Sequence, residues 1–375
     1  MPVFQPLSLF LPYKPQDQVM RSLEDYTPNE ITALKSQQKK GFIHIIQPKP
    51  KTEDKNFEIR TNWINALNNQ LYTPQKKTGV FWYKIKTQGF TFQGLIGACS
   101  ASEFKKRAIT QHEKIYTHRV QLMTDYLKTV RIQAEPVVVI HEEMLDSKID
   151  FTQIEKRTTV FDFQCEQTQH QLWELNRTEI EIVMHWSLHQ PHFHLADGHH
   201  RVASMLHYSN QKQKPAPISC FLIHQSQLEL HSFVWFLKTC KSKDDLDRLV
   251  EQIKLQQGKQ IDLNAVKSKR FEITIKVGKA YFGLEGALSN PPVFINENLL
   301  ESLPQLAEAL HYQPDTKQEI DVAKWEDFEL AFFMKPISKA VLFDLARKGE
   351  NLPAKSTYIL PKLLTGLFVS PIEQD

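Results

Sequence analysis

The chain has 375 residues, 41% hydrophobic and 24% charged, so it can bury a core in two or three folding units and is too apolar to be disordered. Its 46 Lys and Arg nearly balance its 43 Asp and Glu, and a formal net charge of +3 offers no broad basic field to nucleic acid. We expect a cytoplasmic protein that binds no membrane, because the chain lacks a signal peptide and a span of about 20 apolar residues, and its four cysteines form no CxxC pair.

The first third of the chain is predicted to alternate helices with a strand. Thr27 caps a helix that has Pro28 at its first position and Glu30 three residues after the cap, and this helix should end near Gly41. The apolar run 42–46 then predicts a strand, and the helical spacing of apolar residues over 57–71 predicts a second helix.

The middle of the chain is richer in aromatic and β-branched residues. A hairpin is predicted from 80–86 and 90–98, which are separated by Gln88-Gly89. Further strands are expected at 136–141, 158–165, 169–175 and 218–223, and helices at 102–111, 119–130 and 178–188. Beyond residue 235, helices are expected at 241–257, 296–311 and 337–348, with strands at 271–276 and 328–335.

One strand–turn–helix segment carries the strongest chemical pattern. A strand over 192–196 is followed by a turn at Asp197-Gly198 and by a helix from His199 to Tyr208. Glycine lets the backbone approach a ligand closely, and the start of a helix attracts anions. His199, His200 and Arg201 add donors at this place, which predicts a phosphate site.

Asp197 has two further interpretations. Its carboxylate can hold a magnesium ion beside a polyphosphate, or it can simply cap the helix while the histidines lie on the surface. These alternatives stay open from the residues alone.

Other segments offer weaker signals. His112-Glu113 can supply a general base, and Arg119 follows seven residues after His112. Lys355 and Ser356, in a near-terminal stretch that also holds Lys362, can help to bind phosphate, or the stretch can be a strand that completes a sheet. Seven histidines within 23 residues include metal-ligand spacings, but no HExxH signature accompanies them. The histidines are His185, His189, His192, His194, His199, His200 and His207.

Several of these motifs, taken in order, resemble the bacterial domain-of-unknown-function family 1015. The motifs are residues 42–48, 92–98, His112-Glu113-Lys114, residues 196–201, residues 355–358 and Pro361-Lys362. The Asp-Gly-His-His-Arg element in turn resembles the phosphate-binding core of ParB proteins, sulfiredoxin and free-serine kinases. This resemblance implies an α/β (α+β) fold with three parts: an N-terminal α/β segment at 1–75, a ParB/sulfiredoxin-like mixed core at 76–235 and a C-terminal α+β unit at 236–375.

The resemblance also implies roles for the residues. Gly198, His199, His200 and Arg201 would cradle nucleotide phosphates, and Arg119, Lys355 and Ser356 would assist them. Asp197 would support the turn or a magnesium ion, and Glu113 or His112 would act as general base. The implied activity is phosphoryl transfer from ATP or ADP, with Mg²⁺, to a small hydroxyl metabolite.

Two departures from the family pattern keep alternatives open. Ile115 stands where the family often has Thr, and Val234-Trp235 stands where a polar residue followed by Arg is usual. A non-catalytic nucleotide-binding or partner-binding module is therefore an alternative, and a metal-dependent hydrolase that uses the His-rich segment is another. The sequence does not indicate an oligomeric state.

Overall fold

The computed structural model of the protein describes residues 3–47, 54–106, 108–112, 115–145, 148–190, 192–268, 271–286, 288, 290–317 and 319–373. The chain divides into two compact units. Unit 1 comprises Met1–Gln111, Ile115–Leu228 and Pro361–Asp375, and unit 2 comprises His112–Lys114 and Glu229–Leu360. The expected division at residues 75 and 235 stays a prediction about folding modules. By compactness, the N-terminal segment and the C-terminal tail both belong with the core of unit 1.

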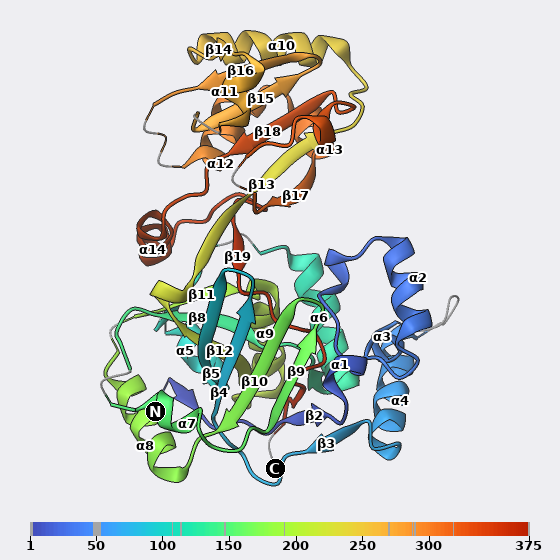
Figure 1. Ribbon diagram of the computed structural model, residues 1–375, viewed down its shortest axis with the longest axis vertical. Coiled ribbons are helices and arrows are strands. Elements are labelled where there is room, and N and C mark those ends of the chain that lie inside the picture. Colours follow the sequence, from blue (N-terminus) through green and yellow to red (C-terminus); the bar gives the residue numbers. More distant parts are fainter. Residues whose placement is uncertain are drawn as a thin grey trace. The chain divides into compact units, whose positions relative to one another are not determined.

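A nine-stranded mixed sheet lies at the centre of unit 1 (Figure 1). Its strand order is β6-β11-β8-β12-β5-β4-β10-β9, with β1 paired to β5. The strands are β1 (Phe4–Gln5), β4 (Phe81–Thr87), β5 (Phe90–Ser100), β6 (Ile109–Thr110), β8 (Val137–His141), β9 (Phe161–Cys165), β10 (Thr168–Glu174), β11 (Phe193–Asp197) and β12 (Pro217–His224). Because β11 and β8 are antiparallel, the end of β11 at Asp197 lies beside the beginning of β8 at Val138.

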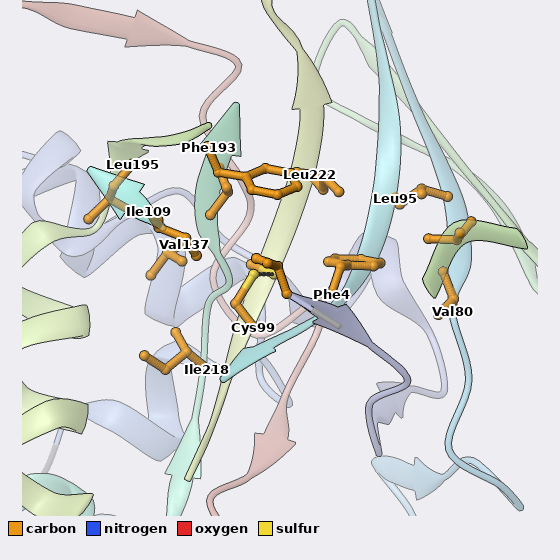
Figure 2. Packing of buried hydrophobic residues seen from close by; sticks show 14 of the residues in the cluster. Phe4, Val80, Leu95, Cys99, Ile109, Val137, Phe193, Leu195, Ile218 and Leu222 are labelled. Atoms are coloured by element: carbon orange, nitrogen blue, oxygen red, sulfur yellow. Dashed lines mark hydrogen bonds between the residues drawn. The ribbon is translucent and has the colours of Figure 1, made fainter. Parts of the chain in front are cut away.

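The core of unit 1 is built from the apolar faces of these strands. All five residues of β8 are buried, as expected of a run of β-branched residues in a central strand. Figure 2 shows Val137 of this strand in the same cluster as Phe193, Ile218 and Leu222 from its neighbours. Val137 is therefore fixed on several sides, which matters for the turn that follows β11.

Helices and two small sheets complete unit 1. The helix α2 begins with the predicted capping box, in which Thr27 and Glu30 bond each other's backbone N–H groups. The helices are α1 (Pro15–Gln18), η1 (Leu23–Asp25), α2 (Pro28–Gln37), α3 (Ile43–Ile46), α4 (Lys55–Asn68), α5 (Ala101–Lys105), α6 (Thr117–Val130), α7 (Phe151–Ile154), α8 (Arg177–Leu188), α9 (His199–Lys212) and η2 (Gln225–Gln227). The small sheets pair β2 (Phe10–Pro12) with β3 (Tyr72–Pro74), and β7 (Ile132–Gln133) with β20 (Ser370–Pro371).

Unit 2 is built on an antiparallel sheet in the order β14-β16-β15-β18-β13-β17, with β19 also paired to β13. Its strands are β13 (Glu229–Leu237), β14 (Lys259–Gln260), β15 (Ile273–Val277), β16 (Ala280–Leu284), β17 (His311–Asp315), β18 (Leu330–Met334) and β19 (Tyr358–Leu360). Its helices are α10 (Lys243–Leu255), α11 (Leu263–Lys267), α12 (Pro291–Phe294), η3 (Ile295–Leu300), α13 (Pro304–Ala309), η4 (Ala323–Trp325) and α14 (Lys339–Lys348). Two mixed units of helices and sheets confirm the predicted α/β (α+β) class.

The strand predicted at 42–46 is wrong, because the segment forms the short helix α3. A short apolar run fits either a strand or a buried helix, and tertiary packing decides between them. Phe42 and Ile45, three residues apart, join one cluster with Trp63 of α4 and with Tyr72. A helical turn brings residues at this spacing to the same face.

Two of the predicted helices are also wrong over much of their length. The helix at 102–111 ends at Lys105, and β6 follows, because Ile109 pairs with Phe193 and enters the core of unit 1. The helix at 296–311 is divided among η3, α13 and β17. Pro304 occupies the start of α13, where its missing N–H costs nothing, and a continuous helix through it would lose a backbone bond.

Candidate functional site

The turn between β11 and α9 has the conformation that its sequence predicts. Gly198 has φ 95° and ψ 26°, a left-handed conformation that favours glycine. A Cβ atom built on Gly198 would lie 2.6 Å from Cγ1 of Val137, so a side chain has no room there. No side chain caps α9, a helix of 14 residues. The turn thus presents close-packed backbone at a helix start, the usual setting for anion binding.

The carboxylate of Asp197 binds two cationic side chains and does not cap α9. Its Oδ2 accepts a hydrogen bond from Nη2 of Arg201 at 2.6 Å, and its Oδ1 accepts one from Nζ of Lys362 at 2.6 Å. Burial would raise the pKa of Asp197, but Lys362 and Arg201 outweigh it and hold the pKa well below its usual range. A carboxylate held so firmly in its charged form is a weak base, so these contacts favour a positioning role for Asp197.

Arg201 is bound on several sides within the turn. Its Nη1 donates to the backbone carbonyls of Pro136 at 2.6 Å and Glu135 at 3.1 Å, and lies 3.0 Å from Oε1 of Glu135. Together with the bond to Asp197, these contacts fix the guanidinium between the beginning of β8 and the end of β11. Arg201 therefore braces the turn, and its predicted contact with phosphate stays a prediction.

Sequence reasoning missed Glu135, and it placed Lys362 in a motif without assigning it to this turn. Lys362 reaches Asp197 across 165 residues of chain, and its side chain is 34% exposed. Oε2 of Glu135 accepts from Oγ1 of Thr365 at 3.0 Å. Burial and the neighbouring Asp197 raise the pKa of Glu135, and Arg201, Thr365 and Lys362 only partly oppose them. The only available signal was the presence of Lys362 in the motif Pro361-Lys362; nothing local pointed to Glu135.

The two histidines of the turn occupy different environments. His199 is buried, with 2% of its surface exposed, whereas His200 is half-buried. Nε2 of His200 accepts the backbone N–H of Tyr116 at 3.1 Å, and the two rings stack with centroids 5.9 Å apart. His200 is therefore the histidine of this pair closer to solvent, at the first turn of α9.

The assisting residues predicted for the turn lie in other contacts. Arg119, on α6, forms an ion pair with Glu24 of η1. Ser356 is buried in unit 2, where its Oγ donates to the carbonyl of Pro353 at 2.6 Å. Lys355, also in unit 2, accepts the indole N–H of Trp235 at its backbone carbonyl, and its Nζ lies over the ring of Phe233. Their roles in phosphate binding stay predictions.

The predicted base falls partly outside the described residues. Glu113 and Lys114 lie outside them, while His112 is buried and its carbonyl accepts the N–H of Leu352 within unit 2. The strand β6 ends at Thr110 and runs parallel to β11, in the direction of Asp197. A shared site between His112-Glu113 and the turn stays a prediction.

The His-rich segment does not form a metal cluster in the described part of the chain. No group of three or more His, Cys, Asp or Glu residues there is arranged to hold a metal ion. His194, with 1% of its surface exposed, has Nδ1 against Oγ1 of Thr110 at 2.6 Å and Nε2 against Glu142 at 2.8 Å. His189 bonds the carbonyl of His185. These contacts give the metal-dependent hydrolase alternative no support.

Comparison with known proteins gives one clear assignment. A family model described as "Protein of unknown function (DUF1015)" matches residues 11–298. The chain belongs to the DUF1015 family. The match includes the turn at Asp197–Arg201 and ends before Lys362. No curated protein matches the chain.

Three solved structures have a distant likeness to this DUF1015 chain. Free serine kinase in complex with AMP is 11% identical with a TM-score of 0.41, and the alignment covers 74% of this chain and 91% of that one. SbnI with C-terminal truncation from Staphylococcus aureus is 11% identical (TM-score 0.40, coverage 74% and 87%). A conserved hypothetical protein from Pyrococcus furiosus is 12% identical (TM-score 0.38, coverage 71% and 90%). Among the described residues, no helix is both long and apolar enough to cross a bilayer.

Proposed function

We propose that this DUF1015 protein binds nucleotide phosphates at the Asp197–Arg201 turn and transfers a phosphoryl group from ATP or ADP to a hydroxyl group of a small metabolite. The observation that carries the proposal is Gly198, a left-handed glycine packed against Val137 at the uncapped start of α9. Backbone N–H groups and the positive end of the helix favour an anion at such a place.

The side chains around the turn supply the charge for this task. Lys362 and Arg201 are both bound to Asp197, and Lys362 keeps a third of its side chain exposed. An incoming phosphate would compete with Asp197 for the ammonium of Lys362, while Arg201 would keep the turn in shape. His200 adds an imidazole ring, a further polar group, at the first turn of α9.

A transfer step also needs a group that accepts the hydroxyl proton, and Glu113 is the candidate. The acceptor oxygen would form a bond to the terminal phosphorus, and the bond from that phosphorus to the departing ADP or AMP oxygen would break. The hydroxyl proton would pass to the Glu113 carboxylate. Both oxygens of Asp197 already bind cations, so the described residues do not fit Asp197 as a magnesium ligand, and no step depends on it.

Calorimetric titration tests the binding half of the proposal. Wild-type protein would be titrated with ATP and with ADP, each with and without magnesium, beside Lys362→Met and the exposed control Lys77→Met. Loss of a charge-assisted contact of roughly 1.5–3 kcal/mol predicts about tenfold or greater weakening for Lys362→Met only. Absence of binding by the wild type, or equal binding by both variants, would overturn the phosphate site.

A second candidate function is a nucleotide-binding module without catalysis. It is favoured by Trp235, which stands where the family usually has Arg, is buried, and donates to the carbonyl of Lys355. Wild-type protein that binds nucleotide would be incubated with radiolabelled ATP or ADP and pools of hydroxyl metabolites. Transfer that is lost in Glu113→Gln, with binding retained, supports the phosphotransferase. Binding without transfer to any pool supports the module.

A further inference from the structure

Unit 2 contains a pocket that lies outside the proposed phosphate site. Its volume is about 960 Å³, and all of its lining residues fall between Leu263 and Glu326. The walls come from α11, from the turn between β15 and β16, from Lys317 and from residues 319–326. This volume is at the upper end of the range typical of small-molecule sites.

A buried lysine forms part of the lining of this pocket. Lys276, on β15, has only 4% of its surface exposed. Its neighbours Ile275 and Val277 point to the opposite face of the sheet, into the cluster shared with α10. Lys276 instead shares a face with its cross-strand partner Tyr281, which also lines the pocket. The strand thus directs Lys276 toward a side of the sheet that has an apolar cluster around Tyr281, Val266 and Trp325. Burial lowers the pKa of Lys276, and the carboxylates of Glu326, Glu329 and Asp327 only partly oppose this effect.

The hydrogen bonds of Lys276 leave one donor unused within the described part of the chain. Its Nζ donates to the carbonyl of Gly278 at 2.5 Å and to the carbonyl of Phe328. An ammonium group has three N–H donors, and no third acceptor for it is found among the described residues. A buried ammonium with a free donor is costly unless an acceptor binds there.

Three more lysines line the same pocket. Lys267 and Lys279 have no ion-pair partner among the residues that the structure describes, whereas Lys317 pairs with Asp321 at 3.4 Å. Glu319 and Glu326 also line the pocket, so its four lysines exceed its three acids by one charge. Leu263 and Val322 add apolar surface beside these charges.

We propose that this pocket binds a small organic anion whose phosphate or carboxylate group accepts from Lys276, Lys267 and Lys279, with its uncharged part against the apolar wall. The inference is independent of the proposed phosphoryl transfer, because it concerns other residues in unit 2. An anion would supply a third acceptor for Lys276 and a counter-charge for Lys267 and Lys279.

The probes for this site are phenyl phosphate and citrate, which represent the two sources of the anionic group. Each would be titrated calorimetrically into the full-length wild type and into the Lys267→Gln/Lys279→Gln double variant. Lys254→Gln, an exposed lysine on α10 outside the pocket, is the matched control. Lys276→Met would be added with a circular dichroism spectrum to check that it folds. The surface double variant keeps the test decisive if Lys276→Met does not.

Saturable binding of at least one probe, weakened about tenfold or more in the double variant and unchanged in Lys254→Gln, supports the site and identifies its preferred anion. The same affinity in Lys362→Met separates this pocket from the phosphate turn of unit 1. No saturable binding of either probe by the wild type would overturn the inference. Equal weakening in the double variant and in Lys254→Gln would also overturn it, because it would indicate diffuse attraction to surface charge.

Discussion

Gly198→Ala tests whether the candidate phosphate turn depends on the close approach of its backbone to β8. In the structure Gly198 has φ 95°, and an added Cβ would meet Cγ1 of Val137 at 2.6 Å and Nε of Arg201 at 3.0 Å. Val137 is buried in the core of unit 1, and the guanidinium of Arg201 is bound to Asp197, Glu135 and Pro136, so neither neighbour can move aside freely. The substitution should therefore strain the backbone and overpack the core together.

The size of the loss follows from these two contributions. A left-handed conformation costs an alanine roughly 1–2 kcal/mol, and overpacking a core costs about 1–3 kcal/mol. The reduced entropy of the unfolded chain returns roughly 0.4–1 kcal/mol. We expect a net loss of about 2–4 kcal/mol in the free energy of unfolding of unit 1. Gly89→Ala is the matched control, because Gly89 has φ 87° and nothing within 4 Å of the added Cβ, so it should lose about 1 kcal/mol or less.

The loss would be measured by hydrogen exchange with mass spectrometry, because the two compact units need not unfold together. Peptides from β8 and α9 report the free energy of unfolding of unit 1 alone. Val137→Ala should partly relieve the clash, so the double variant Val137→Ala/Gly198→Ala should lose less than the sum of the single variants. Equal losses for Gly198→Ala and Gly89→Ala, or strict additivity with Val137→Ala, would refute the role of the close contact.

Two further predictions concern charged and titrating groups of unit 1. Burial lowers the pKa of His170 from 6.5 to about 4. Above pH 6.5 this group should leave the free energy of unfolding unchanged. Between pH 6.5 and 4 the unfolded chain binds the proton and the folded chain does not, so the free energy of unfolding should fall by roughly 3 kcal/mol. Urea denaturation at several pH values should show that loss in the wild type and a shallower fall in His170→Phe; the same fall in both would exclude the burial effect. Asp197→Asn should remove the carboxylate that binds both Lys362 and Arg201 and cost about 2 kcal/mol, whereas Asp125→Asn, at an exposed pair with Lys128, should change the urea midpoint little. A loss in Asp197→Asn no larger than in Asp125→Asn would mean that the ion pairs of the turn do not stabilise it.

The sequence by itself determined the features whose signals are local. Thr27, Pro28 and Glu30 begin a helix because their own side chains and backbone satisfy its first N–H groups. Gln88-Gly89 joins two paired strands because glycine tolerates a positive φ at the tip of a hairpin. The strand, glycine turn and helix around Gly198 followed in the same way, so the place of the candidate site was accessible from a few consecutive residues.

Tertiary structure decided what the side chains of the site contact. Asp197 was open to interpretation as a helix cap or a metal ligand, and it became the partner of Lys362 only because the C-terminal tail returns to unit 1. Glu135 carried no local signal at all, yet it braces Arg201 from the beginning of β8. The run at 42–46 became a helix because Trp63 and Tyr72 bury one face of it. Local propensity fixes a turn within a few residues, but charge pairs and short apolar runs gain most of their stability from packing partners that lie far along the chain.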